Sequence, residues 1–197
     1  ISTIAAMVIL GRIARIAAQH GTKIIVPCLD PVVMTALREV VREAYVSVGR
    51  PEDYEEDRIF YLTGAQFAYA AGMAGIMVRE KTAANFYMGY YYAESLILAE
   101  TGFMAGSIQI VGTDSYTQLP FFIVACDYTL MGEEFFGASA YLSREPKLLG
   151  SLKGQDYSKL LIAVFMTAAI LVATVAGLAG ADGIAEWTQQ LFQYASS

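Results

Sequence analysis

The chain has 197 residues, of which 56% are apolar and 16% are charged, and its formal net charge is −6. The apolar share exceeds that of ordinary soluble domains and excludes a disordered chain, which could not leave so much apolar surface in water. The negative charge argues against a nucleic-acid partner, and two cysteines with a single histidine exclude a disulfide framework or a zinc site of the usual spacing. A membrane-associated protein with a sizeable folded domain remains.

The first ten residues are apolar apart from Ser2 and Thr3, and Arg12 and Arg15 follow at once. Ten residues are too few to cross a bilayer. We therefore expect residues 1–19 to be the inner end of a membrane helix that is truncated at its N-terminus. The alternative is an interfacial amphipathic helix, because Arg12, Arg15 and Gln19 share one helical face.

Residues 20–159 alternate strand and helix patterns. Asp30 and Pro31 open one helix, as a side-chain cap and as a first residue that needs no donor, and this helix ends at Gly49. The pattern predicts further helices at 64–79, 94–100 and 131–142, and strands at 23–29, 58–62, 85–91, 107–112 and 121–126. Alternation at this spacing predicts a single α/β domain with a largely parallel sheet, flanked by membrane helices at both ends.

Residues 160–181 form a run of 22 residues without a charge. A helix of this length spans roughly 33 Å, which exceeds a hydrocarbon core of about 30 Å. The run therefore predicts a transmembrane helix, and a buried core helix is the alternative. Ala173, Gly177 and Ala181 recur at every fourth position, a spacing that permits close helix contact within a membrane.

Basic residues near the two predicted membrane segments indicate the orientation. Arg12, Arg15 and Lys23 follow the first segment, Lys147, Lys153 and Lys159 precede the second, and no Lys or Arg occurs after Lys159. The positive-inside rule then puts the central domain in the cytoplasm at the inner (cell) membrane and the C-terminus outside. Residues 182–197 form an external interfacial tail, because Ile184, Trp187, Leu191 and Tyr194 fall on one helical face.

The chain contains no phosphate-binding loop, dinucleotide fingerprint, nucleophile elbow or Cys-x-x-Cys motif. We therefore expect no catalytic residue, metal or cofactor. Ligands of α/β proteins favour the carboxyl ends of strands. This rule selects the following ligand-binding candidates: Cys28, Asp30, Thr63, Thr113, Asp114, Cys126 and Asp127. The alternative explanation is structural, with Asp30, Thr63 and Asp127 as helix caps and the two cysteines as buried apolar side chains.

Four glutamates lie in otherwise apolar helical patterns and are candidates for buried carboxylates: Glu94, Glu100, Glu133 and Glu134. Such a side chain must face water, find a partner or change its pKa. A two-metal site would need Glu-x-x-His pairs, which the chain lacks. Pairing with Arg79, Lys81 or Arg144 is the alternative.

Two further segments predict contacts between copies of the chain. The pattern of residues 65–75 places Ala68, Gly72 and Gly75 where a helix can approach another backbone, and Tyr90 and Tyr92 lie in a tyrosine-rich stretch of a type enriched at interfaces. Packing within the chain is the alternative for both. Together with Ala173, Gly177 and Ala181, these residues predict a homo-oligomer or a larger membrane complex in contact with the lipid bilayer.

Several stretches resemble a family of bacterial and archaeal membrane proteins that is defined only as a domain of unknown function. These stretches are GRIAR (11–15), NFYMG (85–89), AESLILAETG (93–102), LPFF (119–122) and CDYTLMGEE (126–134). The resemblance covers nearly the whole chain and implies membrane anchoring. It implies no activity and no catalytic residue.

Two functions of different classes follow from these patterns. The first is a membrane-anchored structural or scaffold subunit that self-associates into a membrane assembly. The second is a small-molecule-binding domain, a sensor or an enzyme, that uses the strand carboxyl ends on the cytoplasmic side. The absence of a catalytic motif favours the first.

Overall fold

The computed structural model describes residues 2–143 and 146–178, which contain seven α-helices, two 3-10 helices and five strands. The chain divides into two compact units at residues 145 and 146. Unit 1 is a mixed α/β domain and unit 2 contains the helix α7 (Pro146–Leu178). Residues 146–159, which we expected within the α/β domain, are therefore part of the α7 helix.

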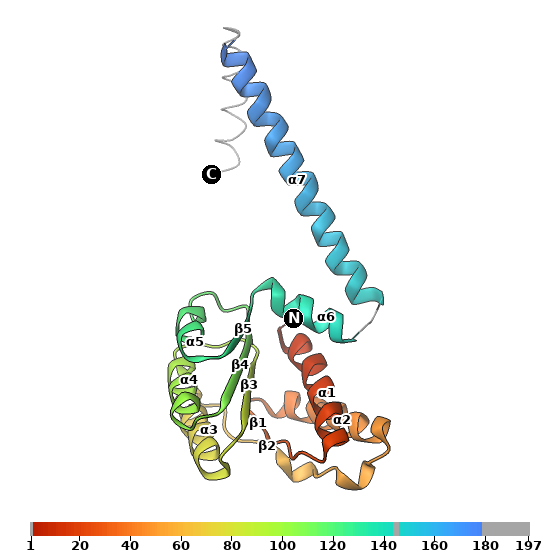
Figure 1. The fold of residues 1–197 in the computed structure, drawn as a ribbon, viewed down its shortest axis with the longest axis vertical. Helices are drawn as coiled ribbons and strands as arrows, with labels where there is room; N and C mark the ends of the chain where they lie inside the picture. The colour runs from red at the N-terminus through yellow and green to blue at the C-terminus, as the bar shows by residue number, and fades with distance from the viewer. Residues whose placement is uncertain (1, 144–145, 179–197) are drawn as a thin grey trace. The chain divides into compact units, whose positions relative to one another are not determined.

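The strands of unit 1 form two short parallel sheets (Figure 1). β1 (Val26–Cys28) pairs with β2 (Ile59–Tyr61), with Pro27 opposite Phe60. β4 (Ile108–Thr113) lies between β3 (Ala84–Met88) and β5 (Tyr128–Met131). The mixed α/β class and the parallel strands are confirmed. The single sheet is corrected, because no strand ladder joins β1 or β2 to β3, β4 or β5 in the described residues.

Helices cover both faces of these sheets. On one face lie α3 (Gln66–Glu80), α4 (Glu94–Met104) and α5 (Leu119–Ala125), and on the other α1 (Ser2–His20), α2 (Pro31–Val48) and α6 (Glu133–Ser143), as Figure 1 shows. Successive residues of a strand point to opposite faces of the sheet, so each strand packs against both layers of helices. Tyr87 packs with the α3, α4 and α5 side, whereas Met88 packs with α1 and α6.

Helix α1 contacts the cores behind both sheets. Its Ala14 and Ala18 belong to a buried cluster with Cys28, Val41 and Ile59. The same helix places Ala5 and Ile9 in a second cluster, with Phe135 of α6 and with Met88 and Leu130 of the larger sheet. The opposite face carries Arg12, Arg15 and Gln19, all exposed. The structure therefore places residues 2–20 inside the α/β unit, as an amphipathic helix.

A buried glutamine joins α4 and α5 to the larger sheet. The Gln109 side chain in β4 is 1% exposed. Its Nε2 donates to the carbonyl oxygens of Ala99 (3.1 Å) and Ala125 (2.8 Å), and its Oε1 accepts from the Tyr87 hydroxyl at 3.0 Å. Every polar atom of this buried amide thus has a partner, which is the condition for burying it without a large desolvation cost.

The predicted strand at residues 121–126 is wrong. The apolar run belongs to the short helix α5, which begins with Leu119 and Pro120, and the strand β5 follows at Tyr128. A short apolar run is compatible with a buried strand and with a buried helix alike. Pro120 favours the helix, because proline fits the first turn, where its missing N–H costs nothing.

Helix α7 differs from every other helix described. Its window Leu149–Val175 has a mean hydropathy of 2.2, and none of that window is buried. Helix α1 also passes the length and hydropathy test, with a mean hydropathy of 1.2. Two helices are therefore long and apolar enough to cross a membrane, and α1 alone of the two contributes buried side chains to unit 1.

We predict that Gly102→Ala destabilises unit 1. A Cβ at this α4 position would lie 2.6 Å from Gln109 Cδ and 2.7 Å from the Tyr87 hydroxyl oxygen, inside the buried network. The expected loss is about 1–3 kcal/mol of the free energy of unfolding, measured by urea titration of the full chain in detergent.

Gly137→Ala is the matched control for this substitution. Gly137 lies in α6 and an added Cβ meets nothing within 4 Å. This variant should be unchanged or more stable by up to about 1 kcal/mol, because alanine favours a helix. Equal effects of the two substitutions would contradict the packing described for Gly102.

Candidate functional site

Three of the predicted ligand-binding residues form local hydrogen bonds at the strand carboxyl ends. Asp30 Oδ1 accepts from the backbone N–H groups of Val32 (2.7 Å) and Val33 (3.2 Å) and so caps α2. Thr63 Oγ1 accepts from Ala65 N at 3.2 Å, just before α3 begins at Gln66. The third is Thr113, whose Oγ1 accepts from Ser115 N at 3.1 Å. These hydrogen bonds fix the loops after β1, β2 and β4.

Asp114 differs from the other carboxyl-end residues. Its Oδ2 accepts a hydrogen bond of 2.6 Å from Ser2 Oγ, which ties the start of α1 to the loop after β4. Its Oδ1 is buried and has no hydrogen-bond partner among the residues described. A buried carboxylate oxygen without a partner is unusual in a folded protein.

Cys126 and Asp127 lie at the other edge of the sheet. We expected both to follow a strand, but they follow α5 and precede β5. Asp127 Oδ2 accepts from Gln109 N at 2.8 Å, and Asp127 N donates to Gln109 O at 3.0 Å. These bonds extend the pairing of β4 and β5 toward their amino ends, so Asp127 does not share a site with Thr113 or Asp114.

Of the four glutamates predicted to be buried, one is buried and three are exposed. Glu94 is 4% exposed, and its Oε2 accepts from Gln66 Nε2 and, at 3.1 Å, from Tyr92 N. Glu100, Glu133 and Glu134 are exposed, which corrects their prediction as buried carboxylates. Their helices are apolar without being fully buried, so these side chains reach water.

Hydrogen bonds between loops use much of the remaining polar surface at the carboxyl edge. The Tyr69 hydroxyl of α3 donates to Pro27 O at 3.1 Å and so connects α3 to β1. Ser115 Oγ donates to Tyr91 O at 2.8 Å. Ser95 Oγ donates to Gln118 Oε1, also at 2.8 Å. The loops at this edge are therefore held by hydrogen bonds between the polar groups named above. Asp114 Oδ1 differs from these groups because it has no partner among the described residues.

Burial controls the chemistry of both cysteines. It raises the pKa of the Cys28 thiol from 9.0 to about 11, with a smaller lowering by Arg38 and a smaller increase from Asp30. It also raises the pKa of the Cys126 thiol to about 11, with a further increase from the Asp127 carboxylate. Both are free cysteines, and both are protonated at neutral pH. Within the described ranges, no group of three or more His, Cys, Asp and Glu side chains could hold a metal ion.

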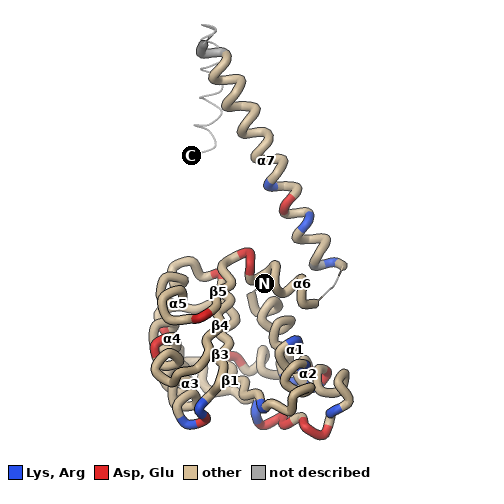
Figure 2. The backbone as a smooth tube through the Cα atoms, in the orientation of Figure 1, with Lys and Arg blue, Asp and Glu red and all other residues tan. Residues whose placement is uncertain are grey.

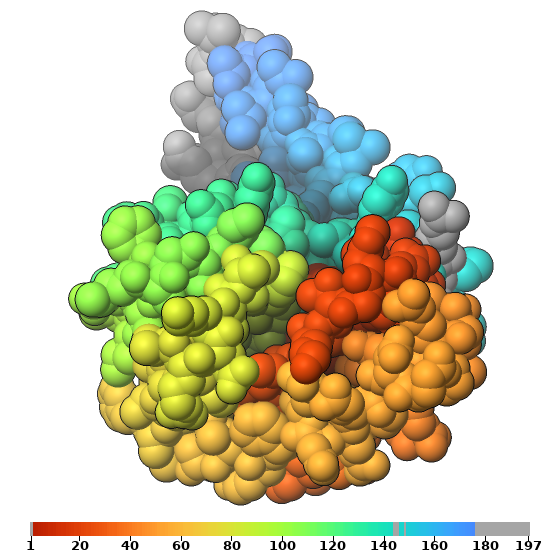
Figure 3. Space-filling view, turned by 60° about the horizontal axis from the view of Figure 1, so that its bottom comes forward, coloured from red at the N-terminus to blue at the C-terminus, as the bar shows by residue number. Residues whose placement is uncertain are grey.

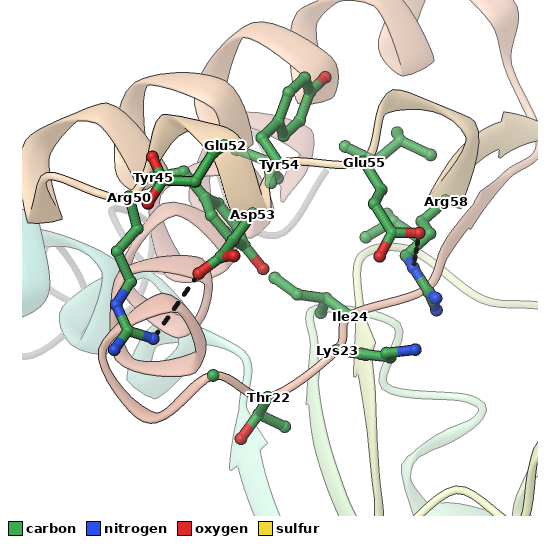
Figure 4. Close-up of a pocket in the computed structure, with 14 residues that line it drawn as sticks. Thr22, Lys23, Ile24, Tyr45, Arg50, Glu52, Asp53, Tyr54, Glu55 and Arg58 are labelled. Carbon is green, nitrogen blue, oxygen red and sulfur yellow. Dashed lines mark hydrogen bonds and ion pairs between the residues drawn. The ribbon is translucent and has the colours of Figure 1, made fainter.

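A cavity of about 420 Å³ opens at the amino edge of the β1–β2 sheet. Its walls come from three segments: the loop between α1 and β1, the inner side of α2, and the loop between α2 and β2 (Figure 4). Figure 3 shows this edge, where the red of α1 lies between the yellow of α3 and the orange of α2. No pattern in the sequence predicts this cavity.

The floor of the cavity is apolar and its rim is charged. Ile24, Val26, Val41 and Ile59 contribute the apolar side chains. The rim carries Lys23, Arg50, Glu52, Asp53, Glu55 and Arg58. Figure 2 shows charged residues gathered along this edge of unit 1, whereas residues 82–143 contain no Lys or Arg.

The residues predicted to contact another copy have different environments. Ala68, Tyr90 and Tyr92 are exposed, and the two tyrosine rings form an edge-to-face pair with centroids 5.0 Å apart. Gly72 faces its own chain, because an added Cβ would lie 2.6 Å from Leu62 Cδ2. Gly75 lies against its own Arg79 side chain. Ala173 is half-buried and Gly177 lies in α7, while Ala181 and the predicted tail at 182–197 lie outside the described residues.

Comparison with known proteins identifies the family of this parallel α/β unit and its long apolar helix, and gives no activity. Residues 1–184 match the family described as "Domain of unknown function (DUF6754)", and the chain belongs to that family. No curated protein and no solved structure matches the chain. The resemblance predicted from the five sequence stretches is thus confirmed at the level of a domain of unknown function.

We predict that both native cysteines react slowly with iodoacetamide at neutral pH. A pKa of about 11 in place of 9.0 lowers the thiolate fraction about a hundredfold at pH 7.5, and the thiolate is the reacting form. The rate constant for Cys126, which is half-buried, should rise about tenfold per pH unit from 7 to 10. The rate is measured by peptide mass spectrometry of the alkylated protein. A rate constant that stops rising with pH below pH 9 would contradict the raised pKa.

Proposed function

We propose that the chain is a membrane-anchored structural subunit that self-associates, with its α/β unit on the cytoplasmic side of the cell membrane. The proposal follows the expectations of the sequence for topology and assembly. Family membership is compatible with it and adds no activity.

The main support for membrane anchoring is the uncharged end of α7. From Leu160 to Leu178 the helix contains no charged residue, and its large apolar side chains are exposed, with Leu161 at 70% and Phe165 at 66%. The two hydroxyls in this stretch donate to their own helix, Thr167 to Ala163 O and Thr174 to Ile170 O, both at 2.8 Å. A lipid bilayer is the solvent in which such a surface is stable, because no polar group there needs water.

Basic residues support the proposed orientation. Lys147, Lys153 and Lys159 precede the uncharged stretch of α7, and no Lys or Arg follows it in the chain. The positive-inside rule counts charges close to the membrane ends, so these three lysines favour a cytoplasmic unit 1. Arg12, Arg15 and Lys23 belong to unit 1, and their positive charge is consistent with a cytoplasmic location of that unit.

Exposed apolar side chains on α4 and α5 support self-association. Phe103 and Met104 at the end of α4 are 71% and 79% exposed, and Val124 of α5 is 88% exposed. These two helices pack side by side, so their outer faces adjoin. A large exposed apolar patch on a folded domain is typical of a surface that binds another protein or a membrane. We therefore assign this α4–α5 surface, in addition to Tyr90 and Tyr92, to contacts within the assembly.

Small-molecule binding at the carboxyl edge is the second candidate function. One observation favours it: the buried, unpartnered Oδ1 of Asp114. The other polar groups named at that edge are used by caps and loop contacts, which is why the structural function is preferred. A thermal-shift screen of the full chain in detergent separates the two, because a ligand that binds the folded state raises the melting temperature.

The orientation predicts that a Ser196→Cys variant is labelled by an impermeant maleimide in intact cells. The wild-type chain is the control, and it should remain unlabelled because burial raises the pKa of both native thiols to about 11. Protection of residue 196 in intact cells, with labelling after lysis, would contradict the proposed topology.

Self-association predicts an oligomeric mass for the full chain in mild detergent. Gly177→Leu should raise the dissociation constant about tenfold, or about 1.4 kcal/mol, by preventing close approach of helices along the Ala173–Gly177 stripe. Val175→Leu is the matched control, because residue 175 falls on the opposite side of the helix. Sedimentation velocity measures both. A monomeric wild type, or equal behaviour of the two variants, would contradict the proposal.

A further inference from the structure

We propose that the cavity at the amino edge of the β1–β2 sheet binds a small organic anion with an apolar body. This site is separate from the membrane helix and from the α4–α5 surface. It also lies at the opposite edge of the strands from Asp114, so it does not depend on either function proposed for the chain.

The size and the floor of the cavity suit a small organic molecule. Its volume of about 420 Å³ falls within the range of about 300–1,000 Å³ that is common for ligand pockets. Ile24 and Val26 enter from the β1 side, Val41 from α2 and Ile59 from β2. An apolar body resting on these four side chains would displace water from a surface that water solvates poorly.

Tyr45 supplies an unused hydrogen-bonding group. The residue is 6% exposed, and its hydroxyl, which makes no hydrogen bond among the described residues, is not one of the fully buried atoms without a partner, so it is accessible from the cavity. Its side chain lines the cavity and its hydroxyl points inward in Figure 4. A tyrosine offers an apolar ring and a hydroxyl that can donate, so an acceptor on a ligand in the cavity could bind this group. Burial raises the pKa of Tyr45, with Asp53 and Glu55 adding to the shift, so the hydroxyl stays a donor at neutral pH.

Two ion pairs on the rim are already formed. Arg50 Nη1 lies 3.6 Å from Asp53 Oδ2 and also donates to Ala18 O at 3.2 Å. Arg58 Nε lies 2.8 Å from Glu55 Oε2. These pairs balance two of the three cations and two of the three carboxylates that line the cavity.

The remaining charges decide the sign of the ligand. Lys23 has no ion pair or hydrogen bond in the described part of the chain, and in Figure 4 its charged end lies on the same side of the view as the charged end of Arg58. The remaining carboxylate, Glu52, points away from Lys23 in the same view. An anionic group would therefore meet the Lys23 ammonium and the outer nitrogens of Arg58. Its apolar body would meet the floor and the Tyr45 hydroxyl.

The test uses the full chain in detergent with ¹³C-labelled isoleucine methyl groups, and phenyl phosphate as the probe. Ile24 and Ile59 report on the cavity floor, whereas Ile97 and Ile123, on exposed positions of α4 and α5, report on non-specific binding. Titration should shift the Ile24 and Ile59 signals to saturation and leave Ile97 and Ile123 unmoved. Benzylamine, which has the opposite charge, should bind at least about fivefold more weakly.

Variants assign the effect to the residues named. Lys23→Gln should weaken phenyl phosphate binding about fivefold or more, and Tyr45→Phe about twofold to fivefold. Lys81→Gln is the matched control, because it removes the same charge at the end of α3 and leaves the cavity lining intact. It should leave binding unchanged.

Four results would overturn the proposal. They are no saturation up to about 10 mM probe, equal shifts at Ile97 and Ile24, tighter binding of benzylamine, and no difference between Lys23→Gln and the wild-type chain. None of these results bears on the mass of the oligomer or on the labelling of residue 196, so the proposed membrane function is tested separately.

Discussion

The packing of α1 is the interaction on which the rest of unit 1 depends. One helix supplies Ala14 and Ala18 to the core behind β1 and β2, and Ala5 and Ile9 to the core behind the larger sheet. Small residues make this possible. At Gly11 an added Cβ would lie 3.1 Å from Val40 Cγ1 of α2, which shows how closely the two helices approach. No strand ladder joins the two sheets in the described residues, so helices hold them together: α1 through both cores, and α3 through the Tyr69 hydrogen bond to Pro27 of β1.

The packing of α1 distinguishes it from α7, although both helices are long and apolar enough to cross a membrane. In α1 the buried residues are Ala5, Ile9, Ala14 and Ala18, which pack into the two cores of unit 1, while Arg12 and Arg15 are exposed. In α7 residues 160–175 carry no charge on any side of the helix, and their large apolar side chains are exposed. A stripe of apolar residues needs a protein neighbour, whereas a helix that is apolar all round needs lipid or a larger assembly. The different surfaces of α1 and α7 are thus the physical basis for assigning the anchor to α7.

Sequence patterns predicted the parts of the fold that depend on local chemistry. Asp30 and Pro31 open α2 as expected, because a capping carboxylate followed by proline acts within one helical turn. The parallel strands β1 to β4 lie within or near their predicted ranges. The run at 121–126 was misassigned because hydrophobicity alone does not separate a short buried helix from a strand. That misassignment predicted Asp127 at the carboxyl edge of the sheet, whereas Asp127 lies at the amino edge, before β5. The cavity could not be predicted, since Lys23, Tyr45 and Arg58 come from three segments that only the tertiary fold brings together.

Lipid-accessible photolabelling tests the central claim most directly, because it reports on α1 and α7 in the same sample. The full chain would be reconstituted in vesicles that contain a lipid with a diazirine in its acyl chain, and the labelled peptides identified by mass spectrometry. The account predicts labels within residues 160–178 and none within residues 2–20, since α1 contributes its apolar face to the core of unit 1. Labelling of α1 at a level similar to that of α7 would contradict it.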